Sequence, residues 1–357
     1  MSRVGRARLR DLGIVTGSLP TGPHNAITDV AGVTVGYRTL IVDEPHVVRT
    51  GVTAIWPRGP LTWSDAVYAG GFSFNGNGEM TGMAWIAEQG LLASPIGITS
   101  THSVGAVHEA ICRLAVRDGG PSEWMLPVVA ETYDGWLSDR AAFAITPQIA
   151  MEAFDAASDA PPAEGNVGGG TGMICHEFKG GTGTASRVVV GDDGLWTVGA
   201  LVQANYGMRP ALRVGGAPVG QTIGCEVVPS PFAVQRDSGS IIVVLATDAP
   251  LLPIQCQRLA RRAATGLAWV GGYGANSSGD IFLAFATGNR LGDAKRTTDV
   301  RMAAPDALSP LFRAAAEATE EAILNALVAA ETMTGFASHT AQAIPLDLLK
   351  QAAFISG

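Results

Sequence analysis

A glycine and a serine stand directly before the most apolar strand-like run of this sequence. The run covers residues 241–246, IIVVLA, and Gly239 and Ser240 precede it. Glycine has no Cβ, so the peptide bond between the two residues can adopt strained angles that bring its carbonyl carbon within reach of the serine hydroxyl. Attack by that hydroxyl gives an ester, and hydrolysis of the ester cuts the chain. The pair therefore has the chemistry of a self-cleaving bond.

Cleavage before Ser240 would also supply a catalytic base. A free α-amino group has an ordinary pKa of about 7.7–8.0, so part of it is neutral near pH 7 and can take the proton from the hydroxyl of its own residue. One residue is then both nucleophile and base, as in N-terminal nucleophile hydrolases. Such an enzyme has no need of a histidine.

The same stretch has a second interpretation. Asp237-Ser238-Gly239 resembles the nucleophile region of chymotrypsin-like proteases, in which a distant histidine and aspartate activate the serine. The flanking glycines and proline of that motif are missing, and no histidine stands in an Ala-Ala-His-Cys setting. The self-cleaving interpretation is therefore favoured.

Other motifs are excluded by their spacing. The glycine-rich stretches at residues 75–78, 168–172 and 180–183 lack the Gly-Lys-Ser/Thr of a Walker loop, and residues 76–82 are one residue too long for a dinucleotide fingerprint. They are interpreted as tight turns near a site. The six histidines show no HxxxH or HExxH spacing, so neither a metal nor an organic cofactor is predicted. The four cysteines form no CxxC pair and are predicted to be free, buried thiols.

The composition excludes some classes of partner and indicates where the protein is located. Lys and Arg total 24 against 32 Asp and Glu, a formal charge of −8, and no basic cluster is present, so nucleic acid is not an expected partner. No apolar run approaches the roughly 20 residues of a membrane helix. The first 20 residues lack the apolar core of a secretion signal. These patterns predict a cytoplasmic protein without membrane contact.

The elements that position the Gly-Ser pair alternate between strands and helices, which predicts an α/β fold. Helical spacing is found at residues 104–114 and 254–267, and Ser309-Pro310 predicts the N-cap and first turn of a helix over residues 311–332. The Pro- and Gly-rich residues 156–170 predict a long surface loop rather than a domain boundary. Short β-like runs occur at residues 32–35, 52–56, 128–131, 187–190, 195–203, 241–246 and 281–286.

A series of sequence blocks follows in order over nearly the whole length, at residues 25–36, 75–82, 130–135, 165–172, 203–207, 239–244 and 246–251. Together these blocks resemble the DmpA/BapA family of N-terminal-nucleophile aminopeptidases, which includes L-aminopeptidase/D-esterase and β-peptidyl aminopeptidase. The resemblance implies a four-layer αββα fold. It also implies a single-domain precursor, residues 1–357, that cuts itself into an α chain of residues 1–239 and a β chain of residues 240–357, and a homotetramer of such αβ pairs.

The resemblance also assigns roles around the cut. Ser240 matches the nucleophile, and Asn205, in QANYG at residues 203–207, matches an amide that stabilises the oxyanion. Ser278 and Asp280 match the hydroxyl and the carboxylate that flank the amine of the nucleophile, and alternate residues of a strand share one face. β-Peptidyl members carry Glu at the position of Asp280.

A second pair of residues is expected to contact the substrate. The resemblance assigns Glu131 to the free ammonium of the substrate and Tyr133 to a second oxyanion donor, again two residues apart at the end of an apolar strand. A buried carboxylate would favour substrates with an N-terminal charge. Trp136 and Trp63 could line the pocket, although packing in the core is the favoured interpretation for both.

The sequence thus predicts an enzyme that removes N-terminal residues from small peptides, amides or esters with a free amine. One alternative is a hydrolase of non-peptide amides such as nylon-type oligomers. Another is a catalytically silent binding protein of the same fold. The set Ser240, Asn205, Ser278, Asp280 and Glu131 argues against the silent alternative.

Overall fold

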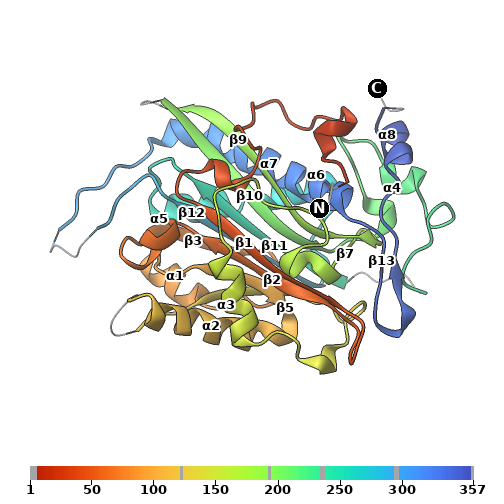
Figure 1. Cartoon of the computed structure of the whole chain (residues 1–357). Coiled ribbons are helices and arrows are strands. Elements are labelled where there is room, and N and C mark those ends of the chain that lie inside the picture. The colour runs from red at the N-terminus through yellow and green to blue at the C-terminus, as the bar shows by residue number, and fades with distance from the viewer. Residues whose placement is uncertain (1–5, 121–123, 192–193, 234–237, 293–296, 355–357) are drawn as a thin grey trace.

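Two sheets lie face to face in the computed structural model, which describes residues 6–120, 124–191, 194–233, 238–292 and 297–354 (Figure 1). The four-stranded sheet has the order β1-β2-β5-β6, with β1 Thr34–Val42, β2 Val48–Trp56, β5 Ile96–Ser100 and β6 Val128–Thr132. The six-stranded sheet has the order β4-β3-β12-β11-β10-β9, with β3 Val67–Ser73, β4 Leu91–Leu92, β9 Gly181–Gly191, β10 Gly194–Asn205, β11 Ser238–Thr247 and β12 Ser277–Ala286. Two hairpins complete the described strands: β7 Ile174–Cys175 with β8 Phe178–Lys179, and β13 Met333–Thr334 with β14 Thr340–Ala341.

Helices cover the outer face of each sheet (Figure 1). The four-stranded sheet packs against α2 (Val104–Arg117) and α3 (Pro147–Asp155), and the six-stranded sheet packs against α5 (Pro253–Ala260) and α7 (Leu308–Ala329), with α6 (Ala263–Val270) against α7. The order of layers is therefore α, β, β, α, as predicted. The remaining helices are α1 (Met83–Gln89), α4 (Val219–Thr222) and α8 (Leu346–Phe354).

The central strand β11 is apolar on both faces because it contributes to two cores. Ile241, Val243 and Leu245 pack toward α5, α6 and α7. Ile242 and Val244, which alternate with them, pack between the two sheets. Each such buried side chain stabilises the fold by about 1.5–3 kcal/mol. The run therefore reads as continuously hydrophobic, as expected for a strand covered on both sides.

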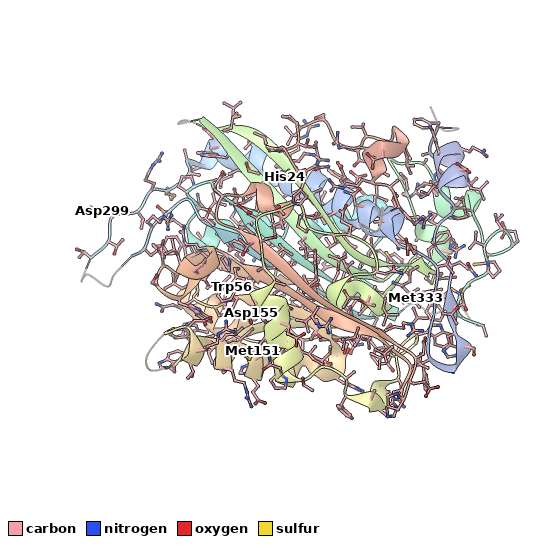
Figure 2. The ribbon with its side chains drawn as sticks, in the orientation of Figure 1. His24, Trp56, Met151, Asp155, Asp299 and Met333 are labelled. Atoms are coloured by element: carbon pink, nitrogen blue, oxygen red, sulfur yellow. The ribbon has the colours of Figure 1, made fainter. Side chains whose placement is uncertain are left out.

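A third core lies between the four-stranded sheet and its helices. Trp56, at the end of β2, contacts Phe154 of α3 edge to face, and its Nε1 donates a hydrogen bond of 3.2 Å to the Phe154 carbonyl. Figure 2 labels Trp56 together with Met151 and Asp155 of α3, and Met151 packs against the same core. Trp63 packs against Trp56 with ring centroids 5.2 Å apart, so it belongs to this core, as favoured from the sequence.

Several boundaries differ from the predictions. The last long helix begins at Leu308 after Ala307 and ends at Ala329, so the predicted cap at Ser309 is wrong. Pro310 fits the first turn because an N–H there has no acceptor within the helix. Residues 254–267 form two helices, α5 and α6, rather than one.

Two predictions about exposure are also wrong in part. The loop at residues 156–170 begins at the surface, but its glycine-rich end is buried against β2 and β9. All four thiols are free, yet Cys225 is exposed and Cys112 is half-buried, because Cys225 lies in a surface turn after α4. No helix in the described part of the chain is both long and apolar enough to cross a membrane.

Candidate active site

The position of β11 between β10 and β12 brings the predicted catalytic residues together. Ser240 pairs with Asn205, the last residue of the antiparallel strand β10. On its other side Ser240 pairs with Gly279 of the parallel strand β12, so Gly239 lies opposite Ser278. Residues that are far apart in the sequence therefore meet at one end of three adjacent strands.

Glycine is required at residue 239 because another backbone lies against it. A Cβ at this position would lie 2.4 Å from the Asn205 carbonyl oxygen and 2.7 Å from the Cα of Tyr206. The apolar run of β11 is buried on both faces, so a shift by one residue would exchange one apolar face for the other. Because a slip by one residue would place a side chain against β10, Gly239 fixes the register that presents Ser240.

The Ser240 hydroxyl lies against the carbonyl that precedes it. Its Oγ donates a hydrogen bond of 2.7 Å to the Gly239 carbonyl oxygen and accepts one of 3.2 Å from the backbone N–H of Gly279. The side chain is buried. The strand pairing thus holds the hydroxyl next to the peptide bond at which cleavage is predicted.

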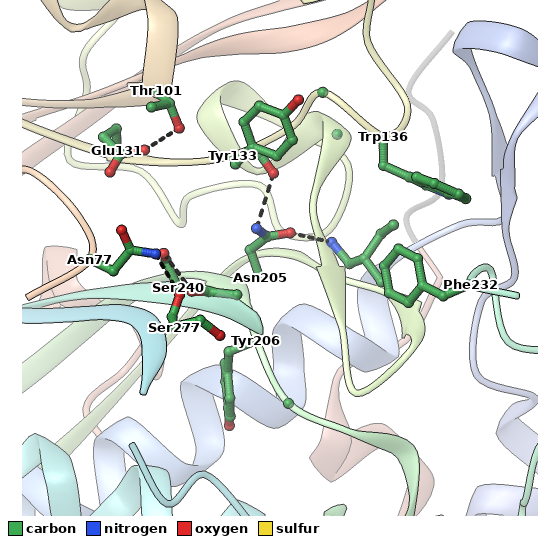
Figure 3. A pocket seen from close by; sticks show the side chains of 15 residues that line it. Asn77, Thr101, Glu131, Tyr133, Trp136, Asn205, Tyr206, Phe232, Ser240 and Ser277 are labelled. Atoms are coloured by element: carbon green, nitrogen blue, oxygen red, sulfur yellow. Dashed lines mark hydrogen bonds between the residues drawn. The ribbon is translucent and has the colours of Figure 1, made fainter. Parts of the chain in front are cut away.

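The amide of Asn205 is oriented by two backbone groups (Figure 3). Its Oδ1 accepts a hydrogen bond of 2.8 Å from the Ile174 N–H, and its Nδ2 donates one of 3.0 Å to the Tyr133 carbonyl. Only an oxygen can accept from Ile174, so Nδ2 is fixed on the opposite side. The second N–H of Nδ2 is the group predicted to stabilise an oxyanion.

A cavity of about 410 Å³ opens beside Ser240 and Asn205. One part of its wall is polar, with Glu131, Asn77 and Ser277, and another is apolar, with aromatic rings that include Trp136 (Figure 3). Trp136 packs edge to face on Phe232 with centroids 5.1 Å apart. Trp136 also packs against the small core of Leu137, Ile174, Met333 and Ala341, so it is both a core residue, as favoured from the sequence, and part of the cavity wall. The size is suited to a small molecule or a short peptide.

Glu131 is a buried carboxylate at the wall of this cavity. Its Oε1 accepts a hydrogen bond of 3.0 Å from the backbone N–H of Glu79, and its Oε2 accepts one from Thr101. Burial raises the pKa of Glu131 above its ordinary value, against these two hydrogen bonds. A cation in the cavity would compensate the cost of desolvating the charge.

Ser278 and Asp280 lie behind the nucleophile rather than in the main cavity. Ser278 Oγ donates a hydrogen bond of 2.6 Å to Asp280 Oδ1, and both residues are buried on β12. They line a separate space of about 10 Å³, the size of one water molecule. Burial raises the pKa of Asp280, while hydrogen bonds from Ser278 and Asn75 oppose the increase.

Tyr133 lines the cavity, but its hydroxyl points away from Ser240 (Figure 3). The group that contacts Asn205 is the Tyr133 carbonyl, which is an acceptor and cannot stabilise an oxyanion. A Cβ on Gly135 would lie 2.2 Å from the Tyr133 hydroxyl oxygen, so the ring occupies the space that this glycine leaves open. The ring has to turn before the hydroxyl can act as predicted.

Sequence reasoning missed the loop that supports both carboxylates. Asn75 Nδ2 donates a hydrogen bond of 3.0 Å to Asp280 Oδ2, and the N–H of Asp280 donates to Asn75 Oδ1 at 2.5 Å. The same loop supplies Asn77 to the cavity wall and the Glu79 N–H to Glu131. The available signal was the sequence NGNG at residues 75–78, which was interpreted as a tight turn near a site.

Comparisons with known proteins agree with this architecture. The model of the family described as Peptidase family S58 matches residues 25–341. The chain belongs to peptidase family S58. Beta-peptidyl aminopeptidase BapA of Sphingosinicella microcystinivorans is a relative with 49% identity over 356 residues, which are 95% of this chain and 89% of the relative.

Two solved structures share the fold over almost their whole length. A Burkholderia beta-aminopeptidase has 51% identity and a TM-score of 0.91, with 98% of this chain and 99% of that chain covered. The L-aminopeptidase D-Ala-esterase/amidase of Ochrobactrum anthropi has 44% identity and a TM-score of 0.90, with the same coverage, and is a variant of the N-terminal nucleophile hydrolase fold.

Membership of S58 confirms the predicted family and the predicted fold. The protein is therefore a hydrolase of the aminopeptidase type with an N-terminal nucleophile hydrolase fold. The alternative that rested on Asp237 concerns a residue outside the described part of the chain. The two-layer sheet core, with helices outside, is unlike the all-β architecture that a chymotrypsin-like serine would need.

Proposed function

We propose that this S58 chain cuts itself between Gly239 and Ser240 and then acts as an aminopeptidase with Ser240 as its nucleophile. The observation that carries the proposal is the 2.7 Å contact of Ser240 Oγ with the Gly239 carbonyl oxygen, at the edge of the cavity. The precursor is one domain, and cleavage gives an α chain of residues 1–239 and a β chain of residues 240–357.

Cleavage proceeds through an ester. Ser240 Oγ attacks the Gly239 carbonyl carbon, the C–N bond breaks, and its electron pair takes a proton to form the α-amine of Ser240. Water then hydrolyses the ester, which leaves a carboxylate on Gly239 and restores the hydroxyl. Each product carries a new charged end. Since β11 is paired on both sides, the new amine stays beside Ser278 and Asp280.

Turnover uses the same groups in a second reaction. The amine of Ser240 takes the proton from its hydroxyl as Oγ attacks the scissile carbonyl of the substrate, and Asn205 Nδ2 donates to the oxyanion that forms. The amine returns the proton to the leaving group, and water hydrolyses the acyl-enzyme. Every step uses groups of the chain itself, so neither a metal nor an organic cofactor is proposed.

The buried carboxylate of Glu131 selects substrates with a free N-terminal ammonium. The substrates are small peptides, amides or esters, and the relatives' names include both a beta-peptidyl and an L-amino-acid activity. A homotetramer of αβ pairs in the cytoplasm is the proposed form of the enzyme.

An E131Q variant is expected to lose kcat/KM for free-amine substrates about 100-fold, mostly through KM, because a buried charge pair to the ammonium is worth about 2–5 kcal/mol. Burial raises the pKa of Glu131, so substrate affinity of the unmutated enzyme is present at neutral pH and falls as pH drops through that raised pKa. E131Q removes this acid limb from the KM profile. Steady-state kinetics across pH measures both effects.

The matched control is E88Q, which neutralises an exposed glutamate of α1 outside the cavity. It should leave KM and its pH profile unchanged. A wild-type KM in E131Q, or equal turnover of N-acetylated and free-amine substrates by the unmutated enzyme, would contradict the proposed role of Glu131.

The whole proposal is tested by intact-mass spectrometry and an activity panel on one preparation. We expect two masses that divide the chain before Ser240 and release of p-nitroaniline from L-alanyl, D-alanyl or β-alanyl p-nitroanilide, but not from an N-acetylated analogue. One mass near 36.8 kDa without activity would support a silent binding protein. Turnover of an aminohexanoate oligomer alone would support the non-peptide amide alternative.

A further inference from the structure

A lysine is buried next to the cavity without a role in the proposed chemistry. Lys179, at the end of β8, is fully buried, and its Nζ donates hydrogen bonds to three backbone carbonyls. The distances are 2.9 Å to Met173, 2.9 Å to Gly180 and 3.5 Å to Gly170. Among the described residues, its hydrogen-bond partners are thus peptide groups rather than a carboxylate. Burial lowers the pKa of Lys179 to about 7, and both the ammonium and the neutral amine can donate hydrogen bonds to these carbonyls.

The carbonyl of Met173 connects Lys179 to the predicted oxyanion amide. This carbonyl accepts from Lys179, and the N–H of the same peptide group, that of Ile174, donates 2.8 Å to Asn205 Oδ1. A peptide group is planar, and in the trans form its C=O and N–H point to opposite sides. Lys179 and Asn205 therefore hold the two ends of one rigid group.

This connection has two effects on Asn205. Fixing the plane of the Met173–Ile174 peptide fixes the direction of the Ile174 N–H, which decides the side of the amide that bears Oδ1. The hydrogen bond from Lys179 to the carbonyl also polarises the peptide and strengthens its N–H as a donor, most strongly when the amine is protonated. A flipped amide would present Oδ1, and a lone pair, to a developing oxyanion.

The surrounding hairpin depends on the same contacts. Met173 O also accepts from the Gly180 N–H at 2.8 Å, and the His176 N–H donates to the Tyr206 carbonyl at 2.7 Å. The β7–β8 hairpin is thereby joined to the end of β10 next to Asn205. Its turn residues His176 and Glu177 have positive φ angles of 48° and 61°, so the turn is strained and relies on these anchors.

We propose that Lys179 is a positioning residue that, through the Met173–Ile174 peptide group, holds the Asn205 amide with Nδ2 toward the reacting carbonyl. The inference rests on the proposed function, because it assigns Asn205 to the oxyanion. Lys179 does not line the cavity, and no described hydrogen bond joins it to Ser240, so the route assigned to its effect is the contact of the Ile174 N–H with Asn205.

The test is a double-mutant cycle of K179M and N205A, with the p-nitroanilide that the unmutated enzyme turns over fastest and with kcat expressed per cut chain. K179M should lower kcat by about 10- to 100-fold with KM little changed, less than the 10²–10³ expected for removal of the donor itself. In the N205A background K179M should lower kcat no further. An equal loss in both backgrounds, or a wild-type kcat in K179M, would overturn the proposal.

Loss of stability is separated from loss of positioning by two further variants. N325A removes a buried side chain of α7 that bonds two backbone groups, Leu9 N and Thr184 O, and does not line the cavity. It should lower the melting temperature and leave kcat unchanged. K179Q keeps two N–H donors without the charge, so it can be measured if K179M fails to fold, and its loss in kcat should be in the same direction but smaller.

A readout without turnover distinguishes this inference from the proposed function. The side-chain amide resonances of Asn205, assigned by their absence in N205A, should shift in K179M and stay in place in N325A. If the unmutated enzyme hydrolyses none of the substrates, the proposed function fails while this shift still tests the contact. An unchanged Asn205 resonance in K179M would contradict the inference about Lys179 without contradicting the proposed function.

Discussion

An S240A variant is expected to remain one uncut chain of about 36.8 kDa and to show no hydrolase activity. Alanine lacks the hydroxyl that contacts the Gly239 carbonyl, so neither the ester of self-cleavage nor an acyl-enzyme can form. Removal of a nucleophile from a serine hydrolase costs on the order of 10⁶ in kcat. Intact-mass spectrometry measures the cut, and release of p-nitroaniline measures the turnover.

The controls for S240A keep the fold and change one property at a time. S64A removes a serine in a turn outside the cavity and should be cut and active like the unmutated chain. S240C keeps a nucleophile and should be cut, at a reduced rate. Two chains in purified S240A would refute both the site of cleavage and the identity of the nucleophile.

The second largest effect is expected for N205A, with a loss of about 10² to 10³ in kcat and little change in KM. The amide donor acts on the charge that develops in the transition state, whereas the bound substrate carries no such charge. Self-cleavage should be slowed as well if the oxyanion that forms on the Gly239 carbonyl also points toward Asn205 Nδ2. Steady-state kinetics on the cut fraction, together with a time course of cleavage after expression, measure the two effects.

Asn166 offers a matched control for Asn205. Its Nδ2 donates 2.8 Å to the Glu331 carbonyl and its Oδ1 accepts from the Glu331 N–H at 3.3 Å, so it also bonds one backbone donor and one backbone acceptor. N166A should therefore lose a comparable pair of hydrogen bonds without an effect on kcat. A kcat in N205A equal to that in N166A would exclude Asn205 from the oxyanion site.

The sequence was most informative where local pattern and chemistry coincide. The apolar run after Ser240 is a strand covered on both faces, and the two-residue spacing of Ser278 and Asp280 places them in hydrogen-bond contact on β12. Glu131 and Tyr133, predicted as a pair, both line the cavity. The order of the four layers was predicted from the sequence blocks that resemble the family. Hydrophobic periodicity alone does not indicate that order.

The parts that could not be predicted depend on contacts between distant segments. Strand β3 was missed because Gly70 and Gly71 weaken its pattern, yet a Cβ on Gly70 would lie 2.4 Å from the Gln257 N of α5. The direction of the Tyr133 hydroxyl depends on the space above Gly135, and the support of Asp280 depends on Asn75, some two hundred residues away. Such contacts exist only once the sheets have formed.

The strand order of the six-stranded sheet determines what the two chains can do after the proposed cut. Strands β11 and β12 of the β chain lie between β3 and β10 of the α chain, so each chain supplies neighbours to the other on both sides. The strands of the two chains alternate in this sheet, so neither chain alone can complete the six-stranded sheet. Separation would require global unfolding, and refolding would need two incomplete chains to find each other. Heat inactivation of the mature enzyme should therefore be irreversible, and its working lifetime is set by the rate of unfolding rather than by an equilibrium.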